Sequence, residues 1–293
     1  MGRITRLTTT AIALSSLTFG AQAFDAEHGD YYRHAKGDVV FHTYTTPNAM
    51  GASAAVVIET PNQLILQDVM ATAINNQELL RLIASLDKPL NRIYISHDHD
   101  HHWLGLEMFD GVPVYAASNV RASIEINGES ALNSNRQQYG GDAIPYQATV
   151  TPQHVQKPGS ITIDGVEMVF GTPFMDMTGP VTFIEFPQQK VLLHHHLAYA
   201  DVHIPMPPAG PRAQTLKRLH EQGYEYMIGG HGTPMNGDAF FATTTQYFDT
   251  VERVVADTDS PEQGIKAMKK AYPAWGALPL LEMMMPANYP AED

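Results

Sequence analysis

Four histidines fall within six residues of this chain, in the run His97-Asp98-His99-Asp100-His101-His102. The sequence has 14 histidines among 293 residues, so this density is far above a chance distribution. Neutral imidazole is a common protein ligand for zinc and also suits iron and copper. Residues 91–96 resemble a short β-branched and aromatic strand, and residues 103–106 resemble the start of a helix. Histidines placed between a strand and a helix can converge, so the run predicts a metal site rather than a solvated polar turn.

Two further groups of histidines also follow strand-like segments. His194, His195 and His196 follow an apolar run at 191–193, and His231 lies in a glycine-rich turn after a strand expected at 224–228. Strand ends can meet at one edge of a sheet, so all three groups are expected to form a single metal site. The chain has no cysteine. Its metal ligands must therefore be His, Asp or Glu, and disulfides, thiolate ligands and iron–sulfur clusters are excluded.

Hydrophobic patterning predicts an α/β (α+β) chain with two sheets packed face to face and helices outside. Strands are expected at 54–59, 64–68, 91–96, 112–116, 148–155, 160–164, 166–171, 181–186, 190–195 and 224–228. Helices are expected near 73–87, 118–127, 213–222, 238–256 and 261–271. Residues 24–50 show no clear periodicity, and the polar, glycine-containing residues 128–147 suggest an exposed insertion. No repeat or linker interrupts the chain, so residues 24–293 are expected to form one domain.

The first 23 residues have the pattern of a secretory signal. Arg3 and Arg6 precede an apolar core over 7–19, and Ala21-Gln22-Ala23 matches a cleavage site, so the mature chain should begin at Phe24. We therefore expect a periplasmic or secreted protein. Removal of the signal segment changes the formal charge from −13 to −15, because two arginines and no acid are lost. This acidity argues against nucleic acid or an anionic membrane as a partner, and no apolar stretch predicts membrane insertion. The expected partner is a small-molecule substrate.

Residues from about Ser53 to Val255 resemble the metallo-β-lactamase superfamily. The family motif is His-x-His-x-Asp-His followed by Gly, with a last His in a Gly-His-Gly turn. Four residues match the first part in register: His97, His99, His102 and Gly105. His231 matches the last His, and Asp68, which ends the second strand of the matched region, matches an Asp that braces the site from behind the ligands. The resemblance implies a four-layer αββα sandwich, the metallo-β-lactamase fold, with one or two metal ions at the edge of the sheets.

Three positions depart from the family pattern. His101 stands where the motif has Asp. In the loop expected to carry a third His, residues 172–179, the best match is Asp176. The bridging Asp of the family falls on His196, with His195 left open because the length of the preceding turn is uncertain. The resemblance therefore implies seven metal ligands: His97, His99, His101, His102, Asp176, His196 and His231.

These exchanges change the expected chemistry. An imidazole cannot bridge two metals without losing its second proton, so His196 disfavours tight coupling of two ions. The site has one anionic ligand, Asp176, in place of the usual two, so the metal would be more electron-poor. It should therefore lower the pKa of bound water at least as much as the usual site of the family does. The general-base carboxylate is missing at position 101. The candidate catalytic residues are therefore His101, Asp98 and Asp100, although the two aspartates can equally orient imidazoles or be solvated turn residues.

The sequence predicts an exported hydrolase of the zinc-dependent, metallo-β-lactamase type. Metal-activated water would act on a small ester, lactone, amide or related substrate. One or two Zn²⁺ ions are expected, with Fe or Mn as alternatives. One alternative function is a mononuclear non-haem iron oxygenase that uses His97, His196 and Asp176. A second is a non-catalytic metal-binding descendant of the family. The substrate, the metal, the number of ions and the oligomeric state stay open.

Overall fold

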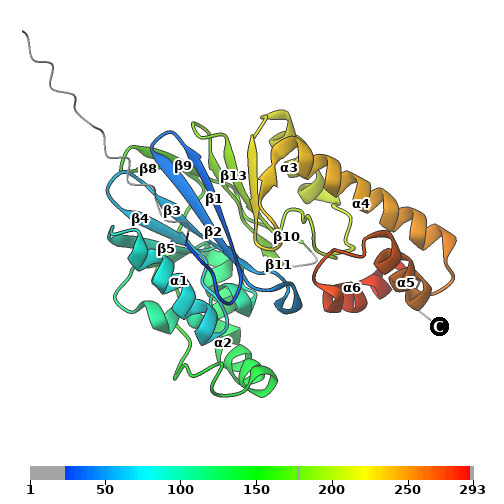
Figure 1. Cartoon of the computed structure of the whole chain (residues 1–293), viewed down its shortest axis with the longest axis horizontal. Helices are drawn as coiled ribbons and strands as arrows, with labels where there is room; N and C mark the ends of the chain where they lie inside the picture. Colours follow the sequence, from blue (N-terminus) through cyan, green and yellow to red (C-terminus); the bar gives the residue numbers. More distant parts are fainter. Residues whose placement is uncertain (1–23, 177–178, 291–293) are drawn as a thin grey trace, which may run out of the picture.

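The structure is a computed structural model that describes residues 24–176 and 179–290, without the side chains of Asp176 and Val181. The expected signal segment, residues 1–23, lies outside the described residues. Two main sheets lie side by side in Figure 1, with helices on their outer faces. The expected α/β fold with two facing sheets is confirmed.

The first sheet has seven strands in sequence order, in which β1 to β4 are antiparallel neighbours and β4 to β7 are parallel. These strands are β1 (Asp30–Lys36), β2 (Val39–Thr45), β3 (Ala54–Glu59), β4 (Leu64–Gln67), β5 (Leu90–Ile95), β6 (Val114–Ala116) and β7 (His154–Val155).

The second sheet has six strands in the order β15-β14-β13-β12-β9-β8. They are β8 (Gly159–Ile163), β9 (Val166–Phe170), β12 (Ile184–Phe186), β13 (Val191–His195), β14 (Tyr226–Gly229) and β15 (Met235–Asn236). Between β9 and β12 the chain forms a separate two-stranded hairpin, β10 (Phe174–Asp176) with β11 (Gly179–Val181).

Helices cover the outer face of each sheet. The α-helices are α1 (Ala73–Ser85), α2 (Ser118–Tyr139), α3 (Gly210–Glu221), α4 (Gly237–Asp257), α5 (Pro261–Ala271) and α6 (Leu278–Met284). Short 3-10 helices are η1 (Asn48–Met50), η2 (Asp100–His102), η3 (Leu104–Phe109) and η4 (Met285–Asn288). In Figure 1, α1 and α2 lie beside the first sheet, and α3 and α4 lie beside the second. No helix in the described ranges is long and apolar enough to cross a membrane.

Alternating side chains place three hydrophobic cores between the four layers. Successive residues of a strand point to opposite faces of its sheet. In β3, Val57 packs in the core beneath α1 and α2, whereas its neighbour Val56 packs in the core between the two sheets. In β13, Leu193 faces the same central core and Leu192 packs under α3 and α4. Both faces of these strands are buried, which explains their nearly continuous apolar sequence.

Besides the strand expected at 148–155, of which only β7 forms, two sequence-based expectations about the fold were wrong. Residues 30–45, which showed no periodicity, form the hairpin β1–β2. Almost every residue of β2 is buried, including the polar side chain of His42, so the polar alternation of a half-exposed strand is absent. The expected insertion at 128–147 is helical as far as Tyr139, because α2 continues through Gly128. A Cβ at Gly128 would lie 2.8 Å from Thr149 Oγ1, so this glycine serves close packing rather than a loop.

Backbone contacts join the two sheets at the edge where the histidines lie. The amide of Ala54 donates to Gly230 O at 2.8 Å, and the amide of Gly232 donates to Ala52 O at 3.0 Å. A β-bridge also pairs Ser53 with His231. The turn after β14 is thereby fixed against the start of β3, so histidines from the two halves of the chain are held at a defined separation.

Candidate metal centre

Six histidines from both halves of the chain converge at this edge. Two groups have ligand atoms that all lie within 4.8 Å of one another: His101, His102, His196 and His231 form one, and His97, His99 and His196 form the other. His97 and His99 follow β5, and η2 carries His101 and His102. His196 directly follows β13, and His231 lies in the turn after β14. Histidines that follow three different strands therefore meet, as their positions in the sequence predicted.

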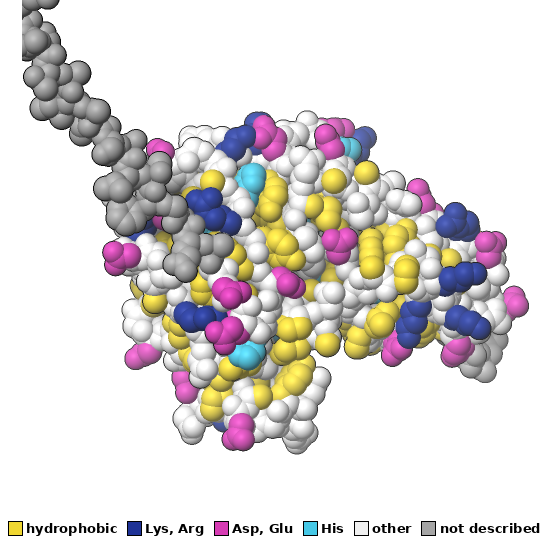
Figure 2. All heavy atoms as spheres, viewed as in Figure 1, with side chains coloured by type: hydrophobic (Ala, Val, Ile, Leu, Met, Phe, Trp, Pro, Cys, Tyr) yellow, Lys and Arg dark blue, Asp and Glu magenta, His cyan; other side chains and the backbone are white. Residues whose placement is uncertain are grey.

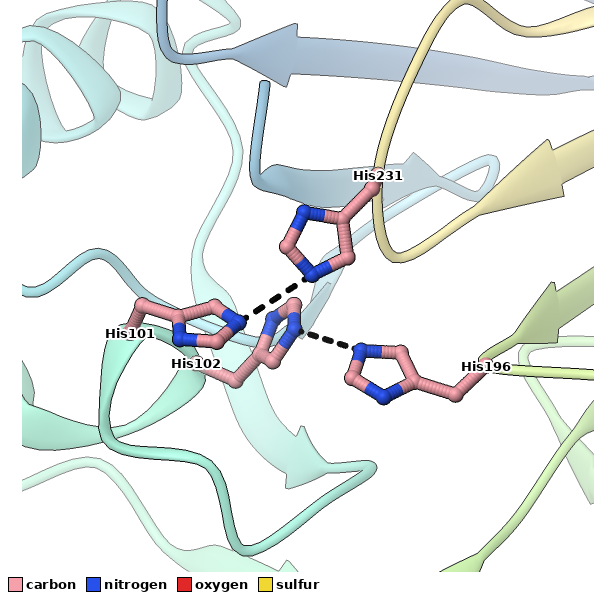
Figure 3. Close-up of side chains that lie close together, drawn as sticks. All are labelled: His101, His102, His196 and His231. Atoms are coloured by element: carbon pink, nitrogen blue, oxygen red, sulfur yellow. Dashed lines mark hydrogen bonds between the residues drawn. The ribbon is translucent and has the colours of Figure 1, made fainter. Parts of the chain in front are cut away.

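The imidazoles of the first group turn their Nε2 atoms toward one another. His101 Nε2 lies 3.1 Å from His231 Nε2, and His102 Nε2 lies 3.0 Å from His196 Nε2. Figure 3 shows both contacts and the four rings, which approach from different directions. Each pair of facing nitrogens has lone pairs or protons directed into the same small space. This arrangement suits a cation that accepts lone pairs from several imidazoles.

His196 belongs to both groups, whereas its two neighbours point elsewhere. The pairing of β13 with β14 shifts register between Leu193 and His195, and His195 has a positive φ of 49°. Such a bulge re-aims the side chains that follow it. The His194 ring packs against Phe240 with centroids 4.4 Å apart, and His195 Nδ1 lies 3.5 Å from Asp68 Oδ2. Of the two histidines left open by the sequence, the structure places His196 among the potential ligands.

The second ring nitrogen of His231 fixes the orientation of its ring. His231 Nδ1 lies 2.8 Å from the carbonyl oxygen of Gly51. A carbonyl can only accept, so the neutral His231 carries its proton on Nδ1 and presents a lone pair at Nε2. His102 Nδ1 lies 3.3 Å from Asp68 Oδ2 but forms no hydrogen bond within the described residues, so Asp68 lies against this ring without fixing it by a hydrogen bond.

Asp68 is fully buried at the end of β4 and braces the site without facing the cleft. Its Oδ1 accepts from the Ser96 amide at 2.9 Å, and its Oδ2 accepts from Ser96 Oγ at 2.7 Å. Burial raises its pKa to about 6, and the imidazole of His195 opposes that rise. Asp68 therefore lies behind the histidines, in the position that the family resemblance implied.

Burial keeps the clustered imidazoles neutral. It lowers the pKa of His231 to about 3, and it lowers the pKa values of His97, His102 and His196 well below 6.5 with help from neighbouring imidazoles. A neutral imidazole has the lone pair that a metal needs. At neutral pH the cluster is therefore in the protonation state that binds a cation.

Asp98 and Asp100 lie beside the histidines and are held by α2. Asp98 Oδ2 accepts from Ser123 Oγ at 2.6 Å, and its Oδ1 lies 3.3 Å from His97 Nδ1. Asp100 Oδ2 accepts from Asn135 Nδ2 at 2.6 Å, and its Oδ1 lies 3.5 Å from the Nδ1 of His101. Both carboxylates also line the cleft described below. They are thus ordered by hydrogen bonds, which a plain solvated turn would not provide.

Asp176 ends β10, and its side chain lies outside the described part of the structure. Its backbone pairs with Gly179, and a Cβ on Gly179 would lie 3.0 Å from both Asp98 Oδ1 and His97 Cε1. The β10–β11 hairpin therefore approaches the site where the sequence placed it. The assignment of Asp176 as a ligand stays a prediction.

The chemistry of the cluster fits a metal. Neither ring nitrogen of His97, nor Nδ1 of His196, makes a hydrogen bond within the described residues, although these atoms are buried. Buried polar atoms are nearly always satisfied, so buried imidazole nitrogens without a hydrogen bond in a histidine cluster suit the binding of a cation. The described part of the cluster contains only neutral nitrogen ligands, which suit zinc and the later first-row metals.

The histidines open into a cleft of about 480 Å³. Besides the histidines and aspartates, its walls contain residues that the sequence had not assigned to the site: Ser123, Asn127, Ala131, Tyr199, Leu280, Met283 and Met284. Trp103 and Ile204 line it as well. Met283 and Met284 of α6 also form part of its wall, a role that only their position against the cleft reveals.

No protein-family model matches the sequence, and no curated protein matches it either. Solved structures do match. A β-lactamase domain protein from Burkholderia ambifaria superposes with a TM-score of 0.62 at 12% identity, covering 89% of this chain and 86% of that chain. A metallo-β-lactamase from Pontibacter korlensis gives 0.55 at 19% identity, covering 74% of this chain and 98% of that chain.

A double mutant of the sec-alkyl sulfatase PisA1 gives a TM-score of 0.58 at 17% identity, covering 88% of this chain and 49% of that chain. At these identities the likeness concerns the fold alone. The order of the layers, the position of the histidines at one edge of the sheets and these superpositions all indicate the same fold. This chain has the metallo-β-lactamase fold.

Proposed function

We propose that this chain is an exported, zinc-dependent hydrolase of small esters, lactones, amides or related compounds. The observation that carries the proposal is the convergence of six histidines, with His196 common to both groups, beside an open cleft that four of them line: His99, His101, His196 and His231. A purely structural cluster would gain nothing from buried imidazole nitrogens without hydrogen bonds. The cleft gives a small molecule access to the same nitrogens.

The two histidine groups define two candidate ion positions. His97, His99 and His196 would hold one ion, with Asp176 as a further candidate. A second ion would lie among the other group: His101, His102, His196 and His231. When bound, zinc supplies a Lewis acid that polarises a carbonyl and lowers the pKa of water.

The chain's own residues supply orientation and proton transfer. Gly51 O fixes the His231 ring, and Asp68 lies against the His102 ring. Asp98 and Asp100 line the cleft, and each keeps one carboxylate oxygen close to an imidazole Nδ1. We assign proton acceptance from water to these carboxylates, since position 101 carries an imidazole in place of the family's carboxylate.

His99 favours the hydrolase over the iron oxygenase. A facial triad needs two histidines and one carboxylate, and in the group with His97 and His196 the third histidine, His99, would occupy a further ligand position. The ordered aspartates favour the hydrolase over a non-catalytic descendant, because α2 holds both of them facing the cleft.

The test is metal analysis and substrate screening of mature protein purified without an affinity tag. We expect bound zinc, hydrolysis of at least one ester, lactone or amide, loss of that activity on chelation, and recovery on adding zinc. His154→Ala, which changes an exposed histidine on β7, is the matched control for His101→Ala. Activity that persists after complete metal removal, or a protein that binds no metal, would overturn the proposal.

Export is part of the same proposal. It is supported by the arrangement of Arg3, Arg6, the apolar core and Ala21-Gln22-Ala23. The formal charge of −13 supports a small molecule rather than a nucleic acid as the partner.

A further inference from the structure

The cleft above the histidines has a distinctive charge pattern. Its described lining contains two carboxylates, Asp98 and Asp100, and no lysine or arginine. The two undescribed residues of the neighbouring hairpin, 177 and 178, are Met and Thr, so they add no cation. Arg212 lines a different cavity, beside Met175 and Met206, and donates to the backbone oxygen of Met206. An anionic group on a substrate would therefore find no cationic side chain in this lining.

The rest of the lining is largely apolar. Five side chains form this apolar wall: Tyr199, Ile204, Leu280, Met283 and Met284. Met283 is 64% exposed and lies beside Leu280 and Met284 in this lining, so the three side chains form a contiguous apolar surface rather than a single exposed residue. Unbranched methionine side chains adapt to flexible apolar partners. In Figure 2, yellow side chains lie over α6. The Lys and Arg side chains at the same end of the molecule gather around α5.

The wall and the histidines belong to the same cleft. Leu280 and the two methionines come from α6, which packs on the loop around Val202 and Ile204 through a shared cluster with Ala277. Ser123 and Asn127 of α2 line the same cleft. A substrate that reaches the histidines must therefore lie between a polar surface on α2 and an apolar surface on α6.

We propose that the substrate is an uncharged ester, lactone or amide with an apolar acyl chain that packs on α6. This inference rests on the proposed hydrolase function and narrows it. A bound zinc ion would attract the group that reacts, but a negative charge elsewhere on the substrate, such as a β-lactam carboxylate, would meet no lysine or arginine in the described lining, and Asp98 and Asp100 would repel it. Met283 and Met284 are specificity-determining residues for the acyl chain.

The first test is equilibrium binding to metal-free, full-length mature protein. Hexananilide and adipanilic acid have the same chain length and differ in a terminal methyl or carboxylate. In the absence of metal, calorimetric titration reports on the lining alone. We expect hexananilide to bind at least tenfold more tightly. Equal or tighter binding of adipanilic acid, or no binding of hexananilide at millimolar concentration, would overturn the inference.

The second test is kinetic and uses the zinc-loaded protein. We expect kcat/KM for 4-nitrophenyl hexanoate to exceed that for mono-4-nitrophenyl adipate by at least tenfold, after subtraction of spontaneous hydrolysis. Faster turnover of the adipate half-ester would overturn the inference and leave the hydrolase standing. If neither ester is hydrolysed but hexananilide still binds preferentially, the proposed function fails and the ligand class stands.

A positive charge added within the lining gives the matched variant. Met283→Lys adds a cation to the cleft at an exposed position, so the fold should be unaffected. We expect it to reduce the preference for hexananilide by about threefold to tenfold, as one added charge near the ligand would do. Val155→Lys is the control, because Val155 lies on the edge strand β7, is 44% exposed and does not line the cleft. An unchanged ratio in Met283→Lys, or an equal change in Val155→Lys, would count against the inference.

Discussion

His101 is the residue at which this chain departs most informatively from the family motif. Its Nε2 faces His231 Nε2 at 3.1 Å, and its Nδ1 lies near Asp100. An imidazole at this position retains the ability to bind metal but gives up the negative charge of a carboxylate. Carboxylates are still present near the site, since Asp98 and Asp100 flank the same histidines. The exchange therefore separates metal binding from proton acceptance, which one aspartate could otherwise combine.

The first prediction concerns His101. His101→Ala should lower the zinc content of the purified protein from about two ions toward one, because a ligand of the second ion is lost. His101→Asp should retain two ions and hydrolytic activity, since the carboxylate can also bind metal. Elemental analysis of each variant is the measurement, with His154→Ala as the control. A wild type that holds a single ion in excess zinc, whatever stands at position 101, would refute this assignment.

His196 should be more damaging to lose than His101. It is the described residue that both histidine groups share, so His196→Ala removes a ligand from each candidate ion. We expect total zinc content to fall below that of His101→Ala, with apparent affinity weakened by tenfold or more at both positions. Competition with a chromogenic chelator measures both affinities. Loss confined to one ion would show that His196 serves a single position.

At the scale of secondary structure, the sequence predicted the parts of the site that follow regular strands. The buried strands β3 and β4 and the strand before His97 were expected from their apolar runs, because a strand covered on both faces leaves that pattern. The family alignment placed the ligand on His196 but left His195 open. The choice between them depends on a bulge in β13, and this bulge arises from pairing with β14, which is distant in the sequence.

The part of the cleft lining that comes from α2 and α6 could not be predicted from the sequence either. The pattern that makes α2 a helix beyond residue 127 involves only a few buried positions, among them Gly128 and Asn135, which local propensity disfavours in helices. Tertiary contacts override that propensity, since Asn135 binds Asp100 and Gly128 packs on Thr149. The cleft is made by contacts between elements, so its lining could not be read from any single segment.

A prediction at this scale concerns Gly105, which lies in η3 and packs against the loop after β4. A Cβ there would lie 2.0 Å from Asn76 Nδ2 and 2.6 Å from Met70 O. Asn76 is buried and also bonds the backbone of Met70 and Thr72, so it cannot easily move. Gly105→Ala should lower the free energy of unfolding by about 1–3 kcal/mol through overpacking.

Gly141→Ala is the matched control for that variant, because nothing lies within 4 Å of its added Cβ. It should leave stability unchanged or raise it by about 0.4–1 kcal/mol, because alanine lowers the conformational entropy of the unfolded chain. Urea unfolding of both variants and of the wild type makes the comparison. Equal stabilities for the two variants would contradict the packing argument at Gly105.

At the scale of the whole molecule, export predicts a defined mature chain. Expression of the full sequence in an exporting bacterial host should yield protein that begins at Phe24, because cleavage is expected after Ala21-Gln22-Ala23. Intact-mass measurement of the soluble, exported fraction is the check. A control with Arg3 and Arg6 changed to Glu should remain unprocessed. Exported protein that retains residues 1–23 would contradict the signal assignment.

The buried histidines also tie global stability to pH in the metal-free protein. Burial lowers the pKa values of His194, His195 and His231 to about 3, against about 6.5 in an unfolded chain. Below pH 6.5 the unfolded state therefore binds protons that the folded state does not, and stability falls as the pH falls toward 3. Asp68 acts in the opposite direction between about pH 6 and 4, because its folded pKa is raised to about 6, but it is one group against several.

We therefore expect the free energy of unfolding of the metal-free protein to decrease steadily from pH 7 to pH 5, by about 2 kcal/mol at pH 5 for each such histidine. Urea unfolding at pH 7, 6 and 5 measures the slope. His194→Leu removes one of these groups at a buried position that packs on Phe240, outside both ligand groups, so its slope should be shallower. Stability that stays constant or rises toward pH 5 would mean that the cluster is already protonated, or open to solvent, in the folded chain. Zinc should steepen the dependence, because protons and metal compete for the same imidazole nitrogens and acid would release the ion before the chain unfolds.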